Sequence, residues 1–369
     1  MTELSADQVR AMRLRAQYLH PGVTPDNMLQ VVRALCGVNA QLKPAMLLSL
    51  RARARGFRPG HLAGQRQELV RTWAMRGTLH LLSRDDLGWI LPLISPRLTA
   101  RTRRRRLELG LDEEKLKRGL REMHAVLAQE GPLTRGELAD RLIGRGVDIE
   151  RKSQALYHLL AYAGLKGLIV MEPDRPDGEE TYSLSKTTGK ALSREQALAM
   201  LAGRYLEGYG PASAADFAAW SGLTMADAKT GWELLRAEGS LADVTVDKRV
   251  LGALEQQLKS ATYDDSTDLI VNLLPAFDTL VLGYSDRSLV VPQKYQAEVY
   301  HGGQTVPVVL VNGAAAGVWR YERQSRSIRI EVHPFGRLDM KTKDLIEEEA
   351  GDVGRLFELA ATVKYASGG

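Results

Sequence analysis

The sequence predicts an α+β fold in which helical units come first and a β-rich region closes the chain. Three observations support this prediction. Helix caps and apolar residues at helical spacing dominate about the first 240 residues, two similar segments begin at Gly131 and Gly210, and short strand-like segments follow from about residue 245. At 369 residues, the chain is also too long for one ordinary core, so several domains are expected.

The first 110 residues are predicted to be mainly helical. Ser5 and Gln8 have the pattern of a capping box, which starts a first helix. A second helix ends at Gly37, and a third begins at Pro44 in the segment PAMLLSLRARARG. QELVRTWAM is predicted to be a short helix, and TLHLL a strand. The third helix is expected to carry three arginines at an exposed end: Arg51, Arg53 and Arg55.

An internal repeat identifies the type of helical unit. The segments GPLTRGELADRLIGRGV and GPASAADFAAWSGLT share Gly-Pro, a hydroxyl cap, an acid three residues later and a closing glycine. The caps are Thr134 with Glu137 and Ser213 with Asp216. A long helix precedes each short capped helix, and another helix and strand-like segments follow it. This order is that of a winged helix, a helix-turn-helix followed by a β-hairpin, whose third helix normally enters the major groove of DNA.

The complete fold prediction is therefore tandem winged-helix units followed by a C-terminal β-rich region. We expect a first winged-helix-like unit at 1–110, a second winged helix at 111–190, a third at 191–245, and a β-rich domain at 246–369. The predicted β segments are LADVTV, LIVNLLP, TLVLGY, VPVVLVNG, AAGVWRYE and SIRIEVHPF. KTKDLIEEEAGDVGRLFELAATV is predicted to close the chain as a helix. A structural ion pair is expected between Asp278 and Arg287.

Positive charge is concentrated at the front of the chain. The formal net charge is +5, whereas residues 1–110 hold 18 Arg and one Lys against seven acidic residues, a balance of +12. The planar guanidinium suits bidentate contact with phosphate, so double-stranded DNA is the expected partner. An arginine-rich surface that only keeps the protein solvated is the alternative, but it does not account for the asymmetry.

Two groups of residues are expected to contact DNA. A basic run favours phosphate contact, with a solvated helix end as the alternative: Arg101, Arg103, Arg104, Arg105 and Arg106. The third helix of the second unit carries polar residues that would face DNA, unless this winged helix serves only as a scaffold: Arg151, Lys152, Gln154 and His158.

Most catalytic and cofactor signatures are missing from the sequence. There is no GxxxxGK[ST] loop, no GxGxxG after a strand and no zinc-ligand spacing among the seven histidines, so neither a cofactor nor a metal is expected. The single cysteine, Cys36, is expected to be a buried small hydrophobe. No apolar run approaches ~18 residues and no signal peptide is evident, so we expect a cytoplasmic protein without membrane contact. We also expect a monomer.

Asn39 and Gln41 are two uncharged carboxamides one residue apart, between two predicted helices. Taken alone, they are most simply explained as residues that bond backbone groups at a turn. Chemistry without a titrating group is the alternative.

Three stretches together resemble the winged-helix DNA glycosylases of the AlkZ type, the family that confers resistance to azinomycin and related DNA alkylators: GVNAQLKPAMLLSLRAR, VRTWAMRGTLHLLSRDDLGWIL and LLPAFDTLVLGYSDRSLVVP. The resemblance runs nearly end to end, and RTWAMRGTLHLL is its most specific part. It implies tandem winged helices in a C-shape around DNA and hydrolysis of the N-glycosidic bond of N7-alkylated purines, including crosslinked ones. The family's catalytic pair, glutamine, an apolar residue, then glutamine or aspartate, falls on Asn39 and Gln41. Gln41 matches this pattern, whereas Asn39 departs from it.

The resemblance suggests roles for the residues at its centre. An N7-alkylated guanine is cationic and leaves as a neutral base, so carboxamide oxygens would only need to hold water and stabilise a sugar cation. Arg76 and His80 would contact phosphate or the extruded nucleotide, and a hydrogen-bonded, partly buried imidazole is the alternative for His80. We therefore expect a monofunctional DNA glycosylase that acts on bulky or crosslinked N7-alkylpurines in duplex DNA. A non-enzymatic winged-helix DNA-binding protein, either a regulator or a damage binder, is the second hypothesis.

Overall fold

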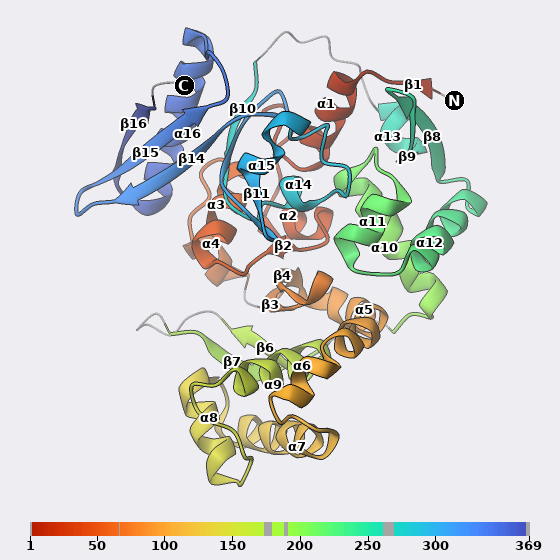
Figure 1. Cartoon of the computed structure of the whole chain (residues 1–369), viewed down its shortest axis with the longest axis vertical. Helices are drawn as coiled ribbons and strands as arrows, with labels where there is room; N and C mark the ends of the chain where they lie inside the picture. Colours follow the sequence, from red (N-terminus) through yellow and green to blue (C-terminus); the bar gives the residue numbers. More distant parts are fainter. Residues whose placement is uncertain (1, 66, 173–178, 188–190, 261–268, 367–369) are drawn as a thin grey trace. The chain divides into compact units, whose positions relative to one another are not determined.

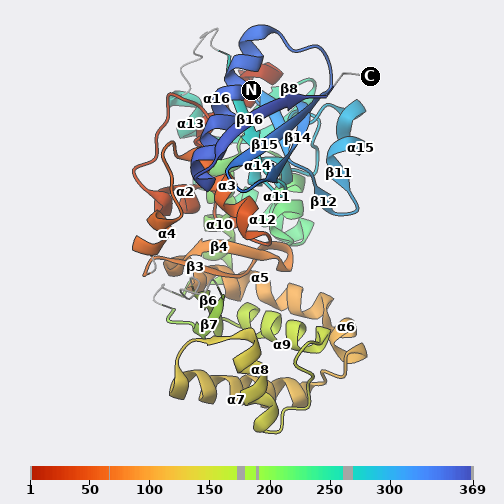
Figure 2. The same ribbon diagram turned by 90° about the vertical axis from the view of Figure 1, so that its left-hand side faces the viewer.

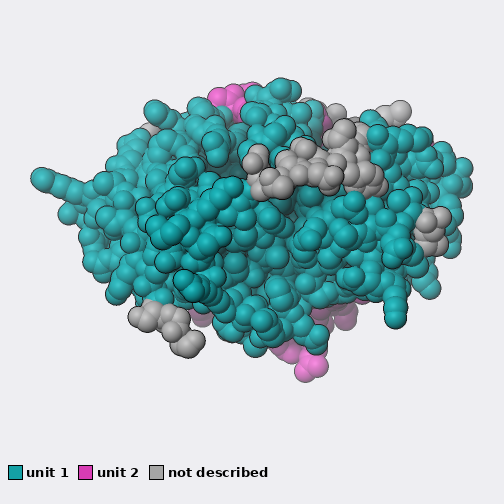
Figure 3. Space-filling model, turned by 90° about the horizontal axis from the view of Figure 1, so that it is seen from above, with its two compact units in different colours: residues 1–62, 198–220, 224–369 teal, residues 63–197, 221–223 magenta. Residues whose placement is uncertain are grey.

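The structure is a computed structural model that describes residues 2–65, 67–172, 179–187, 191–260 and 269–366. Contacts between Cα atoms divide the chain into two compact units, which Figure 3 colours separately. Unit 1 comprises Met1–Leu62, Leu198–Trp220 and Thr224–Gly369, and unit 2 comprises Ala63–Ala197 and Ser221–Leu223. The fold mixes helices with several small sheets (Figure 1), as the α+β prediction required.

Unit 2 combines a small sheet with a group of helices. Its elements are β3 (Leu69–Trp73), η1 (Met75–Gly77), β4 (Leu79–Ser83), η2 (Arg84–Asp86), α5 (Leu87–Arg101), α6 (Arg103–Glu108), α7 (Glu113–Glu130), β5 (Leu133–Thr134), α8 (Arg135–Gly144), α9 (Gln154–Leu165), β6 (Ile169–Glu172) and β7 (Thr181–Leu184). Its strands lie side by side in the order β4-β3-β6-β7-β5. The helix α7 packs against α8, α9 and β7 (Figure 2).

The predicted helix in QELVRTWAM is wrong. Residues Leu69–Trp73 form strand β3, which pairs antiparallel with β4 so that Thr72 lies opposite His80. Valine, threonine and tryptophan are good strand formers, and β4, which the sequence did predict, supplies the hydrogen-bonding partner. The specific segment RTWAMRGTLHLL is thus one β-hairpin around a tight turn.

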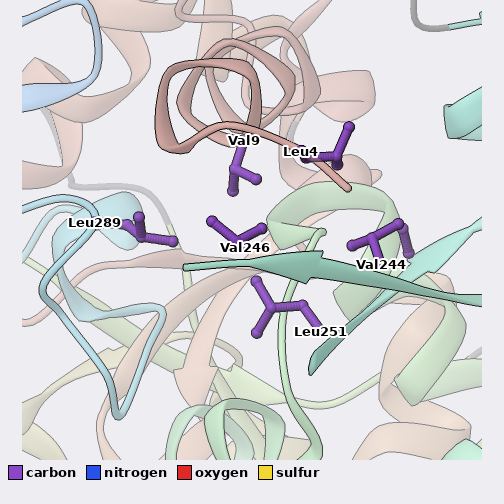
Figure 4. Close-up of a cluster of buried hydrophobic side chains, with 7 residues drawn as sticks. Leu4, Val9, Val244, Val246, Leu251 and Leu289 are labelled. Atoms are coloured by element: carbon purple, nitrogen blue, oxygen red, sulfur yellow. The ribbon is translucent and has the colours of Figure 1, made fainter. Parts of the chain in front are cut away.

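The N-terminal and central parts of unit 1 consist mainly of helices. Its first elements are β1 (Thr2–Glu3), α1 (Ala6–Ala16), α2 (Met28–Ala34), β2 (Val38–Asn39) and α3 (Lys43–Arg53), after which α4 (Gly60–Gly64) leads into unit 2. The chain returns through α10 (Arg194–Tyr209), α11 (Ala214–Ser221), α12 (Met225–Ala237), β8 (Leu241–Val246), β9 (Arg249–Leu254) and α13 (Glu255–Ser260). Strands β1, β8 and β9 form one sheet, and Figure 4 shows side chains of α1 and this sheet meeting in an apolar cluster.

A five-stranded sheet dominates the C-terminal part of unit 1. The elements there are β10 (Val271–Leu274), α14 (Thr279–Leu282), η3 (Gln293–Tyr295), α15 (Gln296–Val299), β11 (Tyr300–His301), β12 (Gln304–Thr305), β13 (Val308–Val311), β14 (Ala314–Arg323), β15 (Ser327–Pro334), α16 (Met340–Phe357) and β16 (Ala360–Tyr365). The sheet order is β10-β13-β14-β15-β16, antiparallel except for the parallel pair β15 and β16. The helix α16 packs against β10 and β16.

Two predictions for this region need correction. TLVLGY is not a strand, because the carboxylate of Asp278 accepts a hydrogen bond from Leu280 N at 3.0 Å and starts the short helix α14. The closing helix stops at Phe357, where Glu358 takes a left-handed backbone conformation with φ 57°. The residues that follow form β16, and their backbone groups make hydrogen bonds with β15 instead of continuing the helix.

The capping predictions are confirmed. Ser5 with Gln8 and Thr134 with Glu137 form complete capping boxes at the starts of α1 and α8. At the start of α11, Ser213 Oγ accepts from Asp216 N at 3.1 Å. In the part of the chain that the structure describes, no helix combines the length and apolar character needed to cross a membrane.

Candidate functional site

The two carboxamides lie in a short connection of unit 1, which we call the amide loop, residues 36–42. The helix α2 ends at Ala34 and α3 begins at Lys43 with proline in its first turn. Two consecutive left-handed residues turn the chain between them, Cys36 with φ 50° and Gly37 with φ 109°. Cys36 is buried as a small apolar side chain, as expected. The loop therefore has a defined, tightly turned backbone.

Within the amide loop, Asn39 and Gln41 are bonded to each other. Asn39 Nδ2 donates to Gln41 Oε1 at 3.2 Å, and Gln41 N donates to Asn39 Oδ1 at 3.2 Å. Asn39 is buried, with 6% of its surface exposed, whereas Gln41 is exposed. Each carbonyl oxygen has two lone pairs, so each oxygen keeps one for a further donor. The pair thus combines a fixed inner amide with an outer amide that solvent can reach.

The helix that follows the amide loop is held by buried arginines. Arg51 and Arg53 are fully buried, so the predicted exposed end of this helix is wrong for both of them. Arg53 forms an ion pair with Asp278, with 2.8 Å between Nη1 and Oδ2. Arg51 forms one with Glu349, with 3.1 Å between Nη2 and Oε2. The expected ion pair of Asp278 with Arg287 is therefore also wrong. Arg287 instead lies over the ring of Tyr300, 3.8 Å from its centroid.

The other two residues at the centre of the family resemblance, Arg76 and His80, lie in unit 2. Arg76 occupies the turn between β3 and β4 with φ 58°, a conformation that few non-glycine residues adopt. His80 is buried on β4, and its Nδ1 lies 3.0 Å from the carbonyl oxygen of Thr78. Burial, together with the nearby Arg76 charge, lowers the pKa of His80 to about 4 despite this hydrogen bond. The imidazole is therefore neutral at pH 7, with Nδ1–H as the donor to Thr78.

The basic run divides into exposed and buried members. Arg103, Arg104 and Arg105 are exposed, as is Arg101. Arg106 is buried: its guanidinium donates to Thr99 O at 2.8 Å and lies over the ring of Tyr162. Arg106 thus joins α6 to α5 and α9 and does not have the exposure that a phosphate contact needs.

The structure brings the exposed run and the start of α9 together. Arg105 Nη2 donates a hydrogen bond to Gln154 Oε1. The pKa of His158 is lowered, first by partial burial and then by the charges of Arg105 and Arg106. We call Arg103, Arg104, Arg105, Gln154 and His158 the basic surface of unit 2. The prediction that Arg151 and Lys152 lie on α9 is wrong, because this helix begins only at Gln154. Both residues are exposed, and Arg151 Nη2 lies 3.4 Å from Asp140 Oδ2.

Sequence reasoning missed two buried polar residues, one on α3, which follows the amide loop, and one on α10. Ser49 and Tyr209 are buried, and each contacts an element far away in the sequence. Ser49 and Arg53 are four residues apart in a helix, and this spacing indicates that both lie on the same face. The sequence does not indicate that their common partner is Asp278. Among the described residues, no group of three or more His, Cys, Asp or Glu is arranged to hold a metal ion.

Comparison with known proteins gives one consistent answer. A family model described as DNA glycosylase AlkZ-like matches residues 32–356. A Streptomyces sahachiroi protein named interstrand DNA cross-link repair glycosylase is 28% identical, over 94% of this chain and 95% of that protein. The solved structure of Streptomyces sahachiroi DNA glycosylase AlkZ matches with a TM-score of 0.81 and 26% identity, covering 99% of this chain and 100% of that one.

Proposed function

The chain belongs to the AlkZ-like DNA glycosylase family, a family of hydrolytic DNA-repair enzymes, and we propose that it excises bulky or crosslinked N7-alkylpurines from duplex DNA. The relative from Streptomyces sahachiroi is named for interstrand cross-link repair, which supports a bulky substrate. The observation that carries the proposal is the mutual hydrogen bonding of Asn39 and Gln41 in the amide loop.

The leaving base makes an uncharged site chemically sufficient. When the bond from C1′ to N9 breaks, its electron pair passes to the purine and neutralises the positive charge of the alkylated ring. No general acid is needed, which separates this reaction from ordinary glycoside cleavage with its two carboxylic acids. The water oxygen bonds to C1′ and its proton passes to solvent. The protein must therefore hold the water and stabilise an oxocarbenium-like sugar.

The amide pair suits these two tasks. The free lone pair of Gln41 Oε1 can accept a hydrogen bond from the attacking water, while the hydrogen bond that it accepts from Asn39 keeps the amide oriented. Carbonyl dipoles that are fixed before the reaction stabilise developing positive charge without reorganising. Neither side chain titrates near neutral pH, so the rate enhancement comes from position and electrostatics.

The proposal extends to the DNA-binding parts of the chain. We assign α7, α8, α9, β6 and β7 to one winged helix and α10, α11, α12, β8 and β9 to another, because each group has the helix, short helix, helix and hairpin order. The four expected domains (1–110, 111–190, 191–245 and 246–369) are kept in this proposal, except that the third one runs to the end of β9 at Leu254 instead of ending at residue 245. The basic surface of unit 2 supplies phosphate contacts, and Arg76 and Lys152 add further ones. We also propose a cytoplasmic, monomeric enzyme that uses no cofactor.

One assay tests the proposal. The protein is incubated with duplex DNA carrying a single N7-alkylguanine, and abasic sites are scored by alkaline cleavage, with the unmodified duplex as control. We expect strand cleavage only at the alkylated position. Binding of the same duplex without any abasic site would favour the second hypothesis, a winged-helix protein that binds DNA without chemistry. The second hypothesis is tested as well because this chain has Asn39 at the position where the family pattern has glutamine.

A further inference from the structure

A single segment of unit 1 is linked to both sides of the amide loop, to α3 directly and to Leu35 through Tyr209. The segment is residues 278–284, which starts at the N-cap of α14 and ends just after that helix. On one side it bonds to α3, which begins directly after the amide loop. On the other side it bonds to Tyr209 of α10, which in turn contacts the residue that precedes the loop.

The contact with α3 is a buried ion pair supported by a serine. Asp278 Oδ2 accepts from Arg53 Nη1 at 2.8 Å and from Ser49 Oγ at 2.7 Å, and Asp278 Oδ1 accepts from Arg53 Nη2 at 2.9 Å. Ser49 and Arg53 are four residues apart and lie on one face of the helix. One carboxylate therefore holds two successive turns of α3. Because a helix is stiff, this contact also restrains its first residue, Lys43, two residues after Gln41.

The contact on the other flank is made by a tyrosine ring that is held on several sides. Tyr209 Oη donates to the carbonyl oxygen of Leu35 at 3.1 Å, directly before the amide loop. Tyr284 Oη donates to Tyr209 O at 2.9 Å, and the rings of Tyr205 and Tyr209 stack with centroids 5.0 Å apart. A Cβ on Gly283 would lie only 2.6 Å from the Tyr209 ring, so the backbone packs directly against it. The Tyr209 ring is therefore fixed against Leu35.

We propose that Asp278 and Tyr209 are positioning residues for base excision. They fix the two flanks of the amide loop and thereby keep Asn39 and Gln41 where the pair orients the attacking water. Neither touches the substrate, so each acts through the loop. This inference rests on the proposed function, because it assumes that the amide pair does chemistry.

A matched pair of variants tests the role of Tyr209. Tyr209→Phe removes the hydrogen bond to Leu35 O, whereas Tyr295→Phe removes a tyrosine-to-carbonyl bond outside the segment 278–284, from Tyr295 Oη to Phe335 O at 3.0 Å. Both should lower thermal stability. Only Tyr209→Phe should slow single-turnover excision, by roughly 10- to 100-fold, since a misplacement of about 1 Å can cost on the order of 100-fold. Duplex affinity should stay unchanged in both variants.

A second pair tests Asp278 without relying on one substitution. Asp278→Asn leaves the buried Arg53 without a counter-charge, so this variant can fail to fold. Ser49→Ala removes only one of the bonds to the carboxylate and keeps the ion pair. Ser49→Ala should slow single-turnover excision, as Tyr209→Phe does, and leave duplex affinity unchanged. An excision rate at the wild-type level in Ser49→Ala would overturn the role of this flank.

Hydrogen exchange of the free protein separates this inference from the proposed function. Peptides covering residues 36–42 should exchange faster in Tyr209→Phe than in wild type, and at the wild-type rate in Tyr295→Phe. If exchange differs in this way but the wild type excises nothing, the proposed function fails while the mechanical link stands. If Tyr209→Phe excises no more slowly than Tyr295→Phe, or its loop exchanges no faster, the positioning role is overturned.

Discussion

Gln41 Oε1 accepts a hydrogen bond from Asn39 Nδ2 at 3.2 Å, so a buried carboxamide orients an exposed one. The arrangement divides the work between two similar side chains. Asn39 is fixed by its surroundings, and Gln41 is available to water and substrate. Substitutions at the two positions should therefore have different effects.

Replacing the outer amide should abolish chemistry and spare binding. Gln41→Ala removes the oxygen that we propose to hold the attacking water, so we expect excision of N7-alkylguanine to fall to background. Duplex affinity should stay close to wild type, because an uncharged side chain adds little to the phosphate contacts that dominate DNA binding. Alkaline cleavage and fluorescence anisotropy on the same duplex measure the two quantities. Wild-type excision by Gln41→Ala would mean that the amide pair is only a turn.

Lengthening the inner amide should raise activity. Asn39 is one methylene shorter than the glutamine expected at this position, which places its amide roughly 1 Å from the usual location, and a shift of this size can cost on the order of 100-fold in rate. Asn39→Gln should therefore increase the single-turnover excision rate. Because Asn39 is buried, the thermal unfolding of this variant should be measured alongside. A lower rate in a variant that is as stable as wild type would show that the neighbouring residues have adapted to asparagine.

Neutralising the exposed arginines should weaken the salt dependence of duplex binding. Removing one phosphate-binding side chain should reduce the slope of log K against log salt by roughly 0.9, so the triple change of Arg103, Arg104 and Arg105 to Gln should flatten the slope with little change in sequence preference. Arg106→Gln is the control, because that side chain is buried against Tyr162. It should lower stability and leave the slope unchanged. Equal slopes for the triple variant and wild type would show that the run only faces solvent.

His80 should make the stability of the protein depend on pH. Its pKa is about 4 in the folded state, against about 6.5 in the unfolded chain. Between these two values the unfolded state binds a proton that the folded state does not, and the free energy of unfolding should fall by about 3 kcal/mol as pH drops from 6.5 to 4. Above about pH 7.5, where the imidazole is neutral in both states, this residue adds no pH dependence.

His80→Asn keeps a donor for the carbonyl of Thr78 but does not titrate. Urea unfolding of both proteins at pH 7 and pH 5 measures the difference, and the wild type should lose more stability on acidification than the variant. Identical losses in the two proteins would mean that His80 is not held neutral in the folded state.

The helix starts could be predicted from the sequence because their causes are local. Thr134 and Glu137 form a capping box between residues three positions apart, and so do Ser5 and Gln8. These bonds form within one turn, so the spacing of the residues already contains the geometry. The strand β4 was predicted for a similar reason, since its apolar residues alternate with polar ones.

Several errors arose where the deciding partner lies outside the segment itself. Arg53 reads as the exposed end of a basic helix, but its counter-charge, Asp278, lies 225 residues further on. The sequence around Leu69–Trp73 is also compatible with a helix. These residues form a strand because they pair with β4. The last residues of the predicted closing helix form strand β16 instead, because they pair with β15.

For the candidate site, the sequence by itself determined the chemistry that is available: two carboxamides, Asn39 and Gln41, in a chain whose front is rich in arginine. Only the tertiary structure decided which amide is buried and which is exposed, and that Arg105 is accessible while Arg106 is not. The physical reason is that residue type and spacing fix local hydrogen bonds. Burial and charge pairing depend on which distant segments pack against a side chain, and no local pattern records that.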